Sequence, residues 1–218
     1  MRTRSEKRRL EIVRVAAKAF EELGYERTSM LTIAERMGGS KQTLYNYFPS
    51  KEDLLRAVLD DGVGEVSQAS LTQFLADAET NLRKALIRGG VAYLTHQLAP
   101  STIALVRTVA NAPADSGLGA EFYENVLHVA WGHVADCFES LMDSGKLRRA
   151  DPLLAALQFK ALNQLDLYER HLLGAATVPD AKEIERTATT AADAFLTIYA
   201  PDASKPEASP RAKGRSKR

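Results

Sequence analysis

The sequence contains little of what stabilises secreted proteins or anchors proteins in membranes. Cys137 is the one cysteine among 218 residues, so an internal disulfide is excluded and nothing requires an oxidising compartment. The first twenty residues carry seven Lys or Arg side chains and no apolar segment of a signal peptide. The longest uncharged stretch, residues 89–106, is interrupted by Gly89-Gly90 and Pro100, which makes it a poor membrane span. We therefore expect a cytoplasmic protein without a membrane partner.

The net charge is only +1, but the charges are unevenly distributed along the chain. Residues 1–56 hold 12 basic and 8 acidic side chains, residues 57–200 hold 11 and 18, and residues 201–218 hold 6 and 2. The positive front of the chain favours a polyanionic partner. A solvated charged face would give the same pattern, so charge alone leaves both interpretations open.

Apolar residues recur every three or four positions along nearly the whole chain, which predicts an all-α fold. No alternating apolar and polar run is long enough for a strand. We expect helices at about 10–23, 30–37, 40–47, from Ser50 onward, 77–98, 102–110, 120–143, 152–173 and 180–200, with a loop at 113–119. Residues 201–218 have no bulky apolar side chain and are expected to form a disordered basic tail.

Residues 28–48 have the order helix, glycine turn, short helix, which is typical of a helix-turn-helix. Thr28 or Ser29 can cap the first of these helices, Gly38-Gly39 breaks it, and Ser40 caps the second. Helical spacing puts a cation, two amides and a phenol on one face of the short helix and two apolar side chains on the other: Lys41, Gln42, Tyr45 and Asn46 against Leu44 and Phe48.

Such polar groups suit base edges and phosphates in a major groove. Several cations near the N-terminus can add phosphate contacts or reach a minor groove: Arg2, Arg4, Lys7, Arg8 and Arg9. Short helices with polar outer faces are also common in proteins that bind no DNA, so the pattern alone leaves that alternative open.

The segment IAERMGGSKQTLYNYFPSKEDLL, residues 33–55, closely resembles the signature of the TetR/AcrR family of bacterial transcriptional regulators. The upstream AAKAFEELGY, residues 16–25, and Thr28-Ser29 are similar to that family's first helix and the cap of its second. The resemblance implies an N-terminal three-helix helix-turn-helix DNA-binding domain at residues 1–56. It also implies a C-terminal helical ligand-binding and dimerisation domain at residues 57–200.

The resemblance also implies roles for individual residues in binding double-stranded operator DNA. Lys41 and Gln42 are the expected base readers. The expected phosphate contacts are Thr43, Tyr45, Asn46, Tyr47 and Lys51, with Thr28 and Ser40 at the N-termini of the two helices. The function implied is a repressor that is released from a palindromic operator by a small-molecule effector.

The last two expected helices carry apolar residues on more than one face, which indicates burial on two sides. A four-helix bundle with two helices from each subunit of a homodimer would bury both faces. The side chains assigned to this contact are Leu154, Leu157, Leu165, Tyr168, Phe195 and Ile198. Family resemblance implies the same dimer, and the alternative is that both faces serve one intrachain core.

The remaining helices, at about 77–143, would enclose an effector site. Polar or aromatic side chains with apolar neighbours are the candidates to line it: Tyr93, His96, Phe122, His128, Trp131 and Asn163. Family resemblance implies a small apolar or amphipathic effector that lowers operator affinity. For each residue taken singly, a place in the core or on the surface is the alternative.

The sequence offers no support for catalysis, a cofactor or a metal. Two pairs, Glu124 with His128 and His133 with Cys137, have the spacing of adjacent ligands on a helix, but no further ligands are supplied to either. No phosphate-binding glycine loop, nucleophile elbow or zinc-protease motif is present. A helical adaptor that binds a protein, an activator on the same fold and a helical enzyme are the competing functions.

Overall fold

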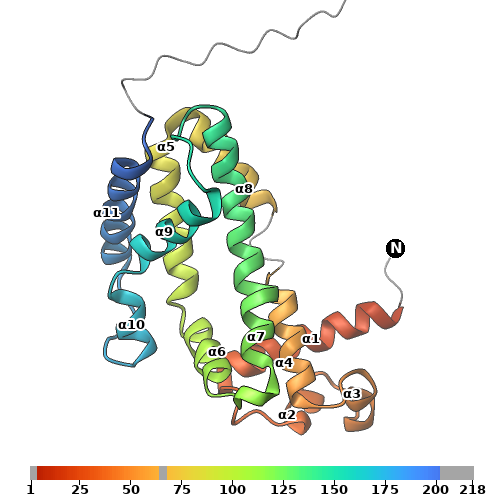
Figure 1. Ribbon diagram of the computed structural model, residues 1–218. Helices are drawn as coiled ribbons and strands as arrows, with labels where there is room; N and C mark the ends of the chain where they lie inside the picture. Colours follow the sequence, from red (N-terminus) through yellow and green to blue (C-terminus); the bar gives the residue numbers. More distant parts are fainter. Residues whose placement is uncertain (1–3, 64–67, 202–218) are drawn as a thin grey trace, which may run out of the picture.

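The computed structural model describes residues 4–63 and 68–201, and every regular element in these two ranges is helical, which confirms the all-α fold class. The elements are α1 (Arg4–Leu23), α2 (Met30–Arg36), α3 (Lys41–Tyr47), α4 (Lys51–Val63), α5 (Gln68–Gln97), α6 (Pro100–Ala110), the 3-10 turn η1 (Ala114–Ser116), α7 (Leu118–Phe122), the π-helix η2 (Tyr123–His128), α8 (Val129–Asp143), α9 (Pro152–Gln164), α10 (Leu167–Leu172) and α11 (Ala181–Tyr199). Figure 1 shows α1 to α4 gathered at one end, called the head, and α5 to α11 forming a larger bundle, called the body.

Local capping signals set the limits of the head helices. Gly24 follows α1 with φ of 82°, a conformation that costs glycine little. Ser29, Ser40 and Ser50 each accept a hydrogen bond from the backbone N–H three residues ahead, with N···Oγ distances of 3.0 Å. The helices bury a common apolar core that includes Ile12, Ala16, Phe20, Ile33, Leu44, Phe48, Leu54 and Leu55.

The body is packed around a cluster of aromatic rings. Phe138 of α8 lies 5.7 Å from Phe159 of α9 and 5.0 Å from Phe195 of α11, measured between ring centroids. Tyr199 stacks on Phe195 at 4.7 Å, and its hydroxyl donates to Gln158 Oε1 at 2.5 Å. These contacts join α8, α9 and α11 in one aromatic cluster.

Head and body share one apolar core and a polar clamp. Val109 of α6 and Leu118 of α7 are buried in the core of the head. Arg56 of α4 donates to Glu121 Oε2 at 2.5 Å and to the carbonyl of Ser116 at 3.1 Å. The bond to Glu121 raises the pKa of Arg56 above its ordinary value. α7 is therefore joined to the head by direct contacts.

The single helix expected over residues 152–173 is wrong. The chain leaves helical geometry at Leu165, with φ of 40° and ψ of −133°, so that α9 and α10 are separate helices. No glycine or proline marks this break in the sequence. A positive φ in a leucine is strained and persists only where the surrounding structure enforces it.

Other limits differ from the expectation because of local geometry. α5 begins at Gln68 rather than near residue 77, and it is interrupted at Asn81, whose side chain accepts from the Lys84 N–H at 2.9 Å like a helix cap. The expected loop at 113–119 contains η1 and the start of α7. The expected helix at 120–143 is continuous, but its residues 123–128 form a π-helix.

The structure describes the segments that could span a membrane only within residues 4–63 and 68–201, and it describes almost none of the expected basic tail. None of the helices in the described ranges is long and apolar enough to cross a membrane. The basic tail expected at 201–218 lies outside the described residues except for Pro201, and Arg2 lies outside them as well.

Candidate nucleic-acid interface and effector region

The short helix α3 is held at the tip of the head by its own cap and by its apolar face. Ser40 caps its N-terminus, and its hydroxyl also lies 2.9 Å from Thr43 Oγ1. Leu44 is fully buried in the head core, and Phe48, which ends the helix, is 2% exposed. These anchors on one side fix which side of α3 faces solvent.

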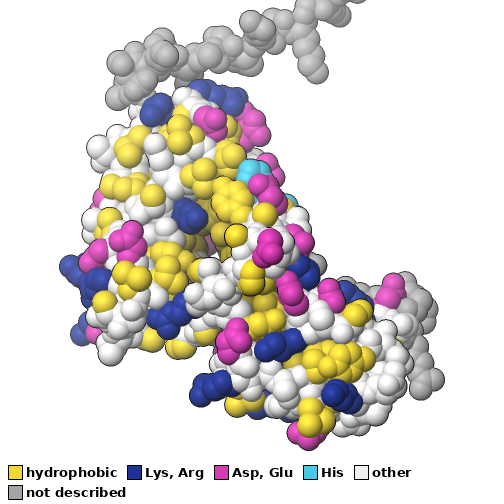
Figure 2. Space-filling view, turned by 60° about the horizontal axis from the view of Figure 1, so that its bottom comes forward, with side chains coloured by type: hydrophobic (Ala, Val, Ile, Leu, Met, Phe, Trp, Pro, Cys, Tyr) yellow, Lys and Arg dark blue, Asp and Glu magenta, His cyan; other side chains and the backbone are white. Residues whose placement is uncertain are grey.

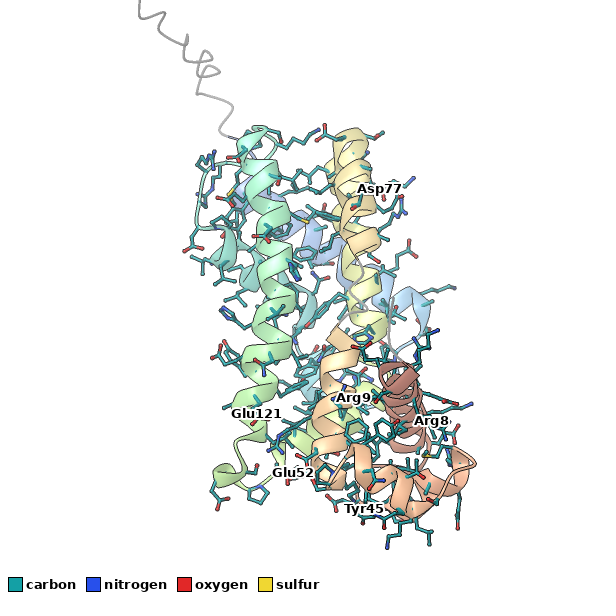
Figure 3. All side chains as sticks on the ribbon, turned by 90° about the vertical axis from the view of Figure 1, so that its right-hand side faces the viewer. Arg8, Arg9, Tyr45, Glu52, Asp77 and Glu121 are labelled. Carbon is teal, nitrogen blue, oxygen red and sulfur yellow. The ribbon has the colours of Figure 1, made fainter. Side chains whose placement is uncertain are left out.

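The opposite side of α3 carries an uninterrupted polar face. Lys41, Gln42 and Asn46 are exposed, and Tyr45 keeps 36% of its surface exposed. The Gln42 amide donates to Asn46 Oδ1 at 3.3 Å, and the Lys41 ammonium lies 5.6 Å from the centre of the Tyr45 ring. Figure 3 shows Tyr45 at the outer tip of the head. The four side chains therefore form one accessible row of hydrogen-bonding groups on a capped helix.

The N-terminal turns of α1 lie beside this tip. The Arg9 guanidinium lies 5.0 Å from the centre of the Phe48 ring, and Arg8 pairs with Glu11 at 2.6 Å. A methyl group on Gly39 would lie 2.8 Å from Met37 Cε and 3.3 Å from Arg8 Nη2, so glycine permits this close approach. Figure 3 places Arg8 and Arg9 on the head near Tyr45, and Figure 2 shows Lys and Arg side chains around a hydrophobic patch of the head.

Three of the residues expected to contact phosphates are less exposed than the polar row of Lys41, Gln42, Tyr45 and Asn46. Thr43 and Tyr47 are half-buried, and Tyr47 packs against the head core. Lys51 donates to the Tyr25 carbonyl at 2.9 Å and lies 4.1 Å from the centre of the Tyr25 ring. Lys51 thus joins α4 to the turn after α1, while its charge stays at the border of the exposed surface.

The structure places Thr28 inside the head, where it cannot reach a duplex. Thr28 is 1% exposed, and its hydroxyl donates to the carbonyl of Gly24 at 2.8 Å, with the carbonyl of Ala19 at 3.2 Å. Ser29, not Thr28, is the cap of α2. The expected phosphate contact at Thr28 is corrected to a structural hydrogen bond that holds the end of α1 on the start of α2.

We expect Thr28→Val to lower the free energy of unfolding by about 1–2 kcal/mol, because buried carbonyls lose their donor. Thr28→Ser keeps the hydroxyl and should stay close to the original stability. Urea denaturation at one fixed protein concentration measures both. Weaker binding of random duplex by a Thr28→Val protein of unchanged stability would contradict this assignment.

Three of the six expected effector contacts meet in the body. The Tyr93 ring of α5 packs edge-on against Trp131 of α8, with centroids 5.2 Å apart. The Tyr93 hydroxyl accepts from Gln164 Nε2 of α9 at 2.9 Å. Asn163, which is fully buried, donates to the Phe159 carbonyl at 2.9 Å, while its Oδ1 has no hydrogen-bond partner in the described part of the chain. Sequence reasoning missed Gln164, whose only signal is its place next to Asn163.

The other three expected contacts lie elsewhere. Phe122 packs against the head core rather than inside the body. His96 and His128 are exposed, and His128 lies 6.4 Å from the ring of Tyr123. Phe122 therefore belongs to the head, and His96 and His128 lie on the exposed surface, three residues along the chain from Tyr93 and Trp131 respectively.

Exposed apolar side chains are concentrated at the C-terminal end of the chain. Six of the large hydrophobic residues exposed in the described ranges lie between 154 and 198: Leu154, Leu157, Leu165, Leu173, Val178 and Ile198. Four of them were assigned to the dimer contact from the sequence, and Tyr168, also assigned, is half-buried. Phe195 is fully buried in the aromatic cluster of its own chain, so it is not available to a partner.

Family comparisons match both parts of the chain. The family described as bacterial regulatory proteins, tetR family, matches residues 12–58, and the family described as AefR-like transcriptional repressor, C-terminal domain, matches residues 84–201. A curated relative from Bacillus subtilis (strain 168), the uncharacterised HTH-type transcriptional regulator YfiR, is 35% identical over 60 residues. That alignment spans 28% of this chain and 29% of the relative.

Solved structures match nearly the whole chain. A TetR-family transcriptional regulator from Mesorhizobium loti MAFF303099 is 27% identical with a TM-score of 0.81, over 91% of this chain and all of that one. The flavonoid-responsive regulator FrrA is 30% identical with a TM-score of 0.65, over 90% of this chain and all of that one. A TetR transcriptional regulator from Agrobacterium tumefaciens is 25% identical with a TM-score of 0.70, over 89% of this chain and 95% of that one.

Proposed function

The chain belongs to the TetR family of bacterial transcriptional regulators, and from this premise we propose that it is a homodimeric repressor released from a palindromic operator by a small-molecule effector. Residues 1–56 would form the DNA-binding domain and residues 57–200 the ligand-binding and dimerisation domain. The observation that carries the proposal is the exposed polar row on α3, Lys41, Gln42, Tyr45 and Asn46, opposite the buried Leu44.

The row has the chemistry for reading a major groove. A lysine donates to guanine acceptors, and glutamine or asparagine both donates and accepts at adenine. The N-terminus of α3 and the cations of α1 lie beside the row and supply partners for phosphates, which orient a protein on a duplex without reading sequence. We assign Lys41 and Gln42 to base edges. The residues assigned to phosphates of the DNA backbone are Ser40, Thr43, Tyr45, Asn46, Tyr47 and Lys51.

The proposed dimer would use the exposed apolar side chains of α9 and α11. Two heads related by a two-fold axis match two half-sites about one helical turn apart. An effector bound between α5, α8 and α9 would change the separation of the heads, because α7, η2 and α8 form one continuous rod that reaches the head core at Leu118. The flavonoid-responsive relative supports an effector with an aromatic skeleton.

Selection of bound sequences from random duplex DNA, followed by gel shift in increasing salt, tests the function. We expect an inverted repeat and a steep fall of affinity with salt, because phosphate contacts release counterions. A salt slope near zero, or no enriched sequence, would overturn the proposal and favour an adaptor that binds a protein.

Gln42→Ala should change the preferred base at one position of each half-site and weaken binding to the selected operator by about 1–3 kcal/mol. Lys51→Ala is the companion variant. It should weaken binding to the operator and to random duplex alike, because Lys51 is assigned to phosphates of the DNA backbone. Competition gel shifts with both duplexes measure the two effects. Equal loss on operator and random duplex for Gln42→Ala would contradict its role as a base reader.

A further inference from the structure

Lys160 of α9 is a half-buried cation. No carboxylate of the described residues lies within 4.0 Å of its ammonium, although residues 57–200 carry 18 acidic side chains against 11 basic ones. Its ammonium lies 5.9 Å from the centre of the Trp131 ring. Burial lowers the pKa of Lys160 because the charged form loses hydration. An anion beside it would restore the lost stabilisation of the charge.

A second donor lies against the same indole ring. The Tyr93 hydroxyl accepts from Gln164 Nε2 at 2.9 Å, and its own proton has no acceptor among residues 4–63 and 68–201. Tyr93 is half-buried and packs edge-on against Trp131. Lys160 and Gln164 are four residues apart on α9 and therefore lie on the same face of that helix. An ammonium and a phenol thus flank one aromatic wall.

Asn163 adds a buried polar atom next to this face. Its Oδ1 has no hydrogen-bond partner among the described residues, and it lies where a Cβ on Gly90 would come within 2.3 Å. This oxygen lies directly against Gly90 of α5 and can only accept a hydrogen bond, so it is not a partner for an anion. The site is therefore formed by Tyr93 of α5 and Trp131 of α8, with Lys160 and Gln164 of α9.

We propose that the effector is an aromatic or amphipathic acid whose anionic group pairs with Lys160 and accepts from Tyr93, while its apolar part lies on Trp131. This inference rests on the proposed function and narrows its ligand to anions. Charge-assisted hydrogen bonds to a half-buried ammonium are stronger than neutral ones, which makes the acidic group the main determinant of specificity.

The position of the site connects it to the head. Trp131 lies three residues beyond η2, and Val126 of η2 packs against the head core. A π-helix has weaker backbone geometry than an α-helix and often marks a functional position. An acid held against Trp131 would therefore bind within three residues of the segment of the rod that is not α-helical.

Two fluorescent probes with the same skeleton test the charge requirement on the full chain. Anilinonaphthalene sulfonate is an anion, and phenylnaphthylamine is the same skeleton without the sulfonate. Trp131 is the only tryptophan, so quenching of its emission reports a probe bound nearby. We expect Lys160→Gln to weaken sulfonate binding about tenfold and to change phenylnaphthylamine binding less than about twofold. Lys160→Arg should retain most of the sulfonate affinity.

Lys182→Gln is the matched control, because it removes the same charge from an exposed position of α11. Equal sulfonate affinity in Lys160→Gln and the unchanged protein, an equal loss in Lys182→Gln, or no quenching of Trp131 by the sulfonate would each overturn the inference. Operator binding by gel shift is scored separately. If sulfonate binding does not depend on Lys160 but the protein binds its operator, only the anionic effector is contradicted. If the protein binds no operator, the proposed function is contradicted.

Discussion

Leu154→Glu is expected to convert the proposed homodimer into monomers without unfolding the chain. Leu154 is 51% exposed in the first turn of α9, where its N–H is bonded to the capping Asp151 at 2.9 Å. A carboxylate at a helix N-terminus is locally favourable, so the monomer fold is not penalised. In the dimer the same carboxylate would lose its hydration without a partner, a cost of several kcal/mol.

We expect the dissociation constant of the dimer to rise at least about 100-fold, which corresponds to about 2.7 kcal/mol. Analytical ultracentrifugation over a range of concentrations measures it, and circular dichroism confirms that the helices persist. Leu31→Glu is the matched control, since Leu31 is also 51% exposed in a first helical turn but lies in the head. A Leu154→Glu protein that stays dimeric would exclude this face.

Operator affinity should fall when the dimer dissociates. Two linked heads bind a palindrome more tightly than one, because the second head binds at a high effective concentration, which adds a factor of about 100 to 10,000. The Leu154→Glu protein should retain weak binding to single half-sites, since α3 is untouched. Comparing half-site and full-site duplexes in one gel distinguishes a loss of dimerisation from a loss of base recognition by α3.

Phe195→Ala is expected to destabilise the protein by about 3–5 kcal/mol. Phe195 is fully buried and contacts three other rings, those of Phe138, Phe159 and Tyr199. Truncation removes those contacts and leaves a cavity that three helices must close together. Urea denaturation at a fixed protein concentration measures the loss, because the stability of a dimer depends on concentration.

Two further variants show whether the loss of stability comes from lost packing or from removal of an aromatic ring at any position. Phe195→Leu should recover more than half of the lost stability, because leucine fills much of the volume. Tyr123→Ala removes a ring that is 52% exposed, and it should change the stability by less than about 1 kcal/mol. If Phe195→Ala and Tyr123→Ala cost the same, the aromatic cluster is not the centre of the body.

The head could be predicted closely because its signals are local. Ser40 and Ser50 precede their helices and cap them in the structure, and Gly24 ends α1. The polar and apolar faces of α3 follow from spacing within seven residues. Where two adjacent residues offered the same signal, as Thr28 and Ser29 did, only the fold could choose between them. It buries the threonine and leaves the serine at the helix end.

The body was harder to predict because its apolar residues serve more than one purpose. Leu154 and Phe195 both lie on apolar stripes, yet one is exposed and the other is fully buried. Phe122 and Trp131 lie on one rod, but Phe122 packs on the head and Trp131 in the body. Periodicity identifies a buried face without identifying its neighbour.

By itself the sequence determined which side of α3 is polar and which family the head resembles. It also determined where five helices begin: α2, α3, α4, α9 and α11. These properties depend on backbone hydrogen bonds and spacing within a few residues. Only the tertiary structure decided that Leu165 breaks a helix, that Thr28 is buried, and that Lys160, Tyr93 and Trp131 meet. Thr28 is buried because α1 packs on α2, and the contacts at Trp131 arise because α5, α8 and α9 pack together. The residues at Trp131 are dozens of positions apart, so their contacts leave no pattern along the chain.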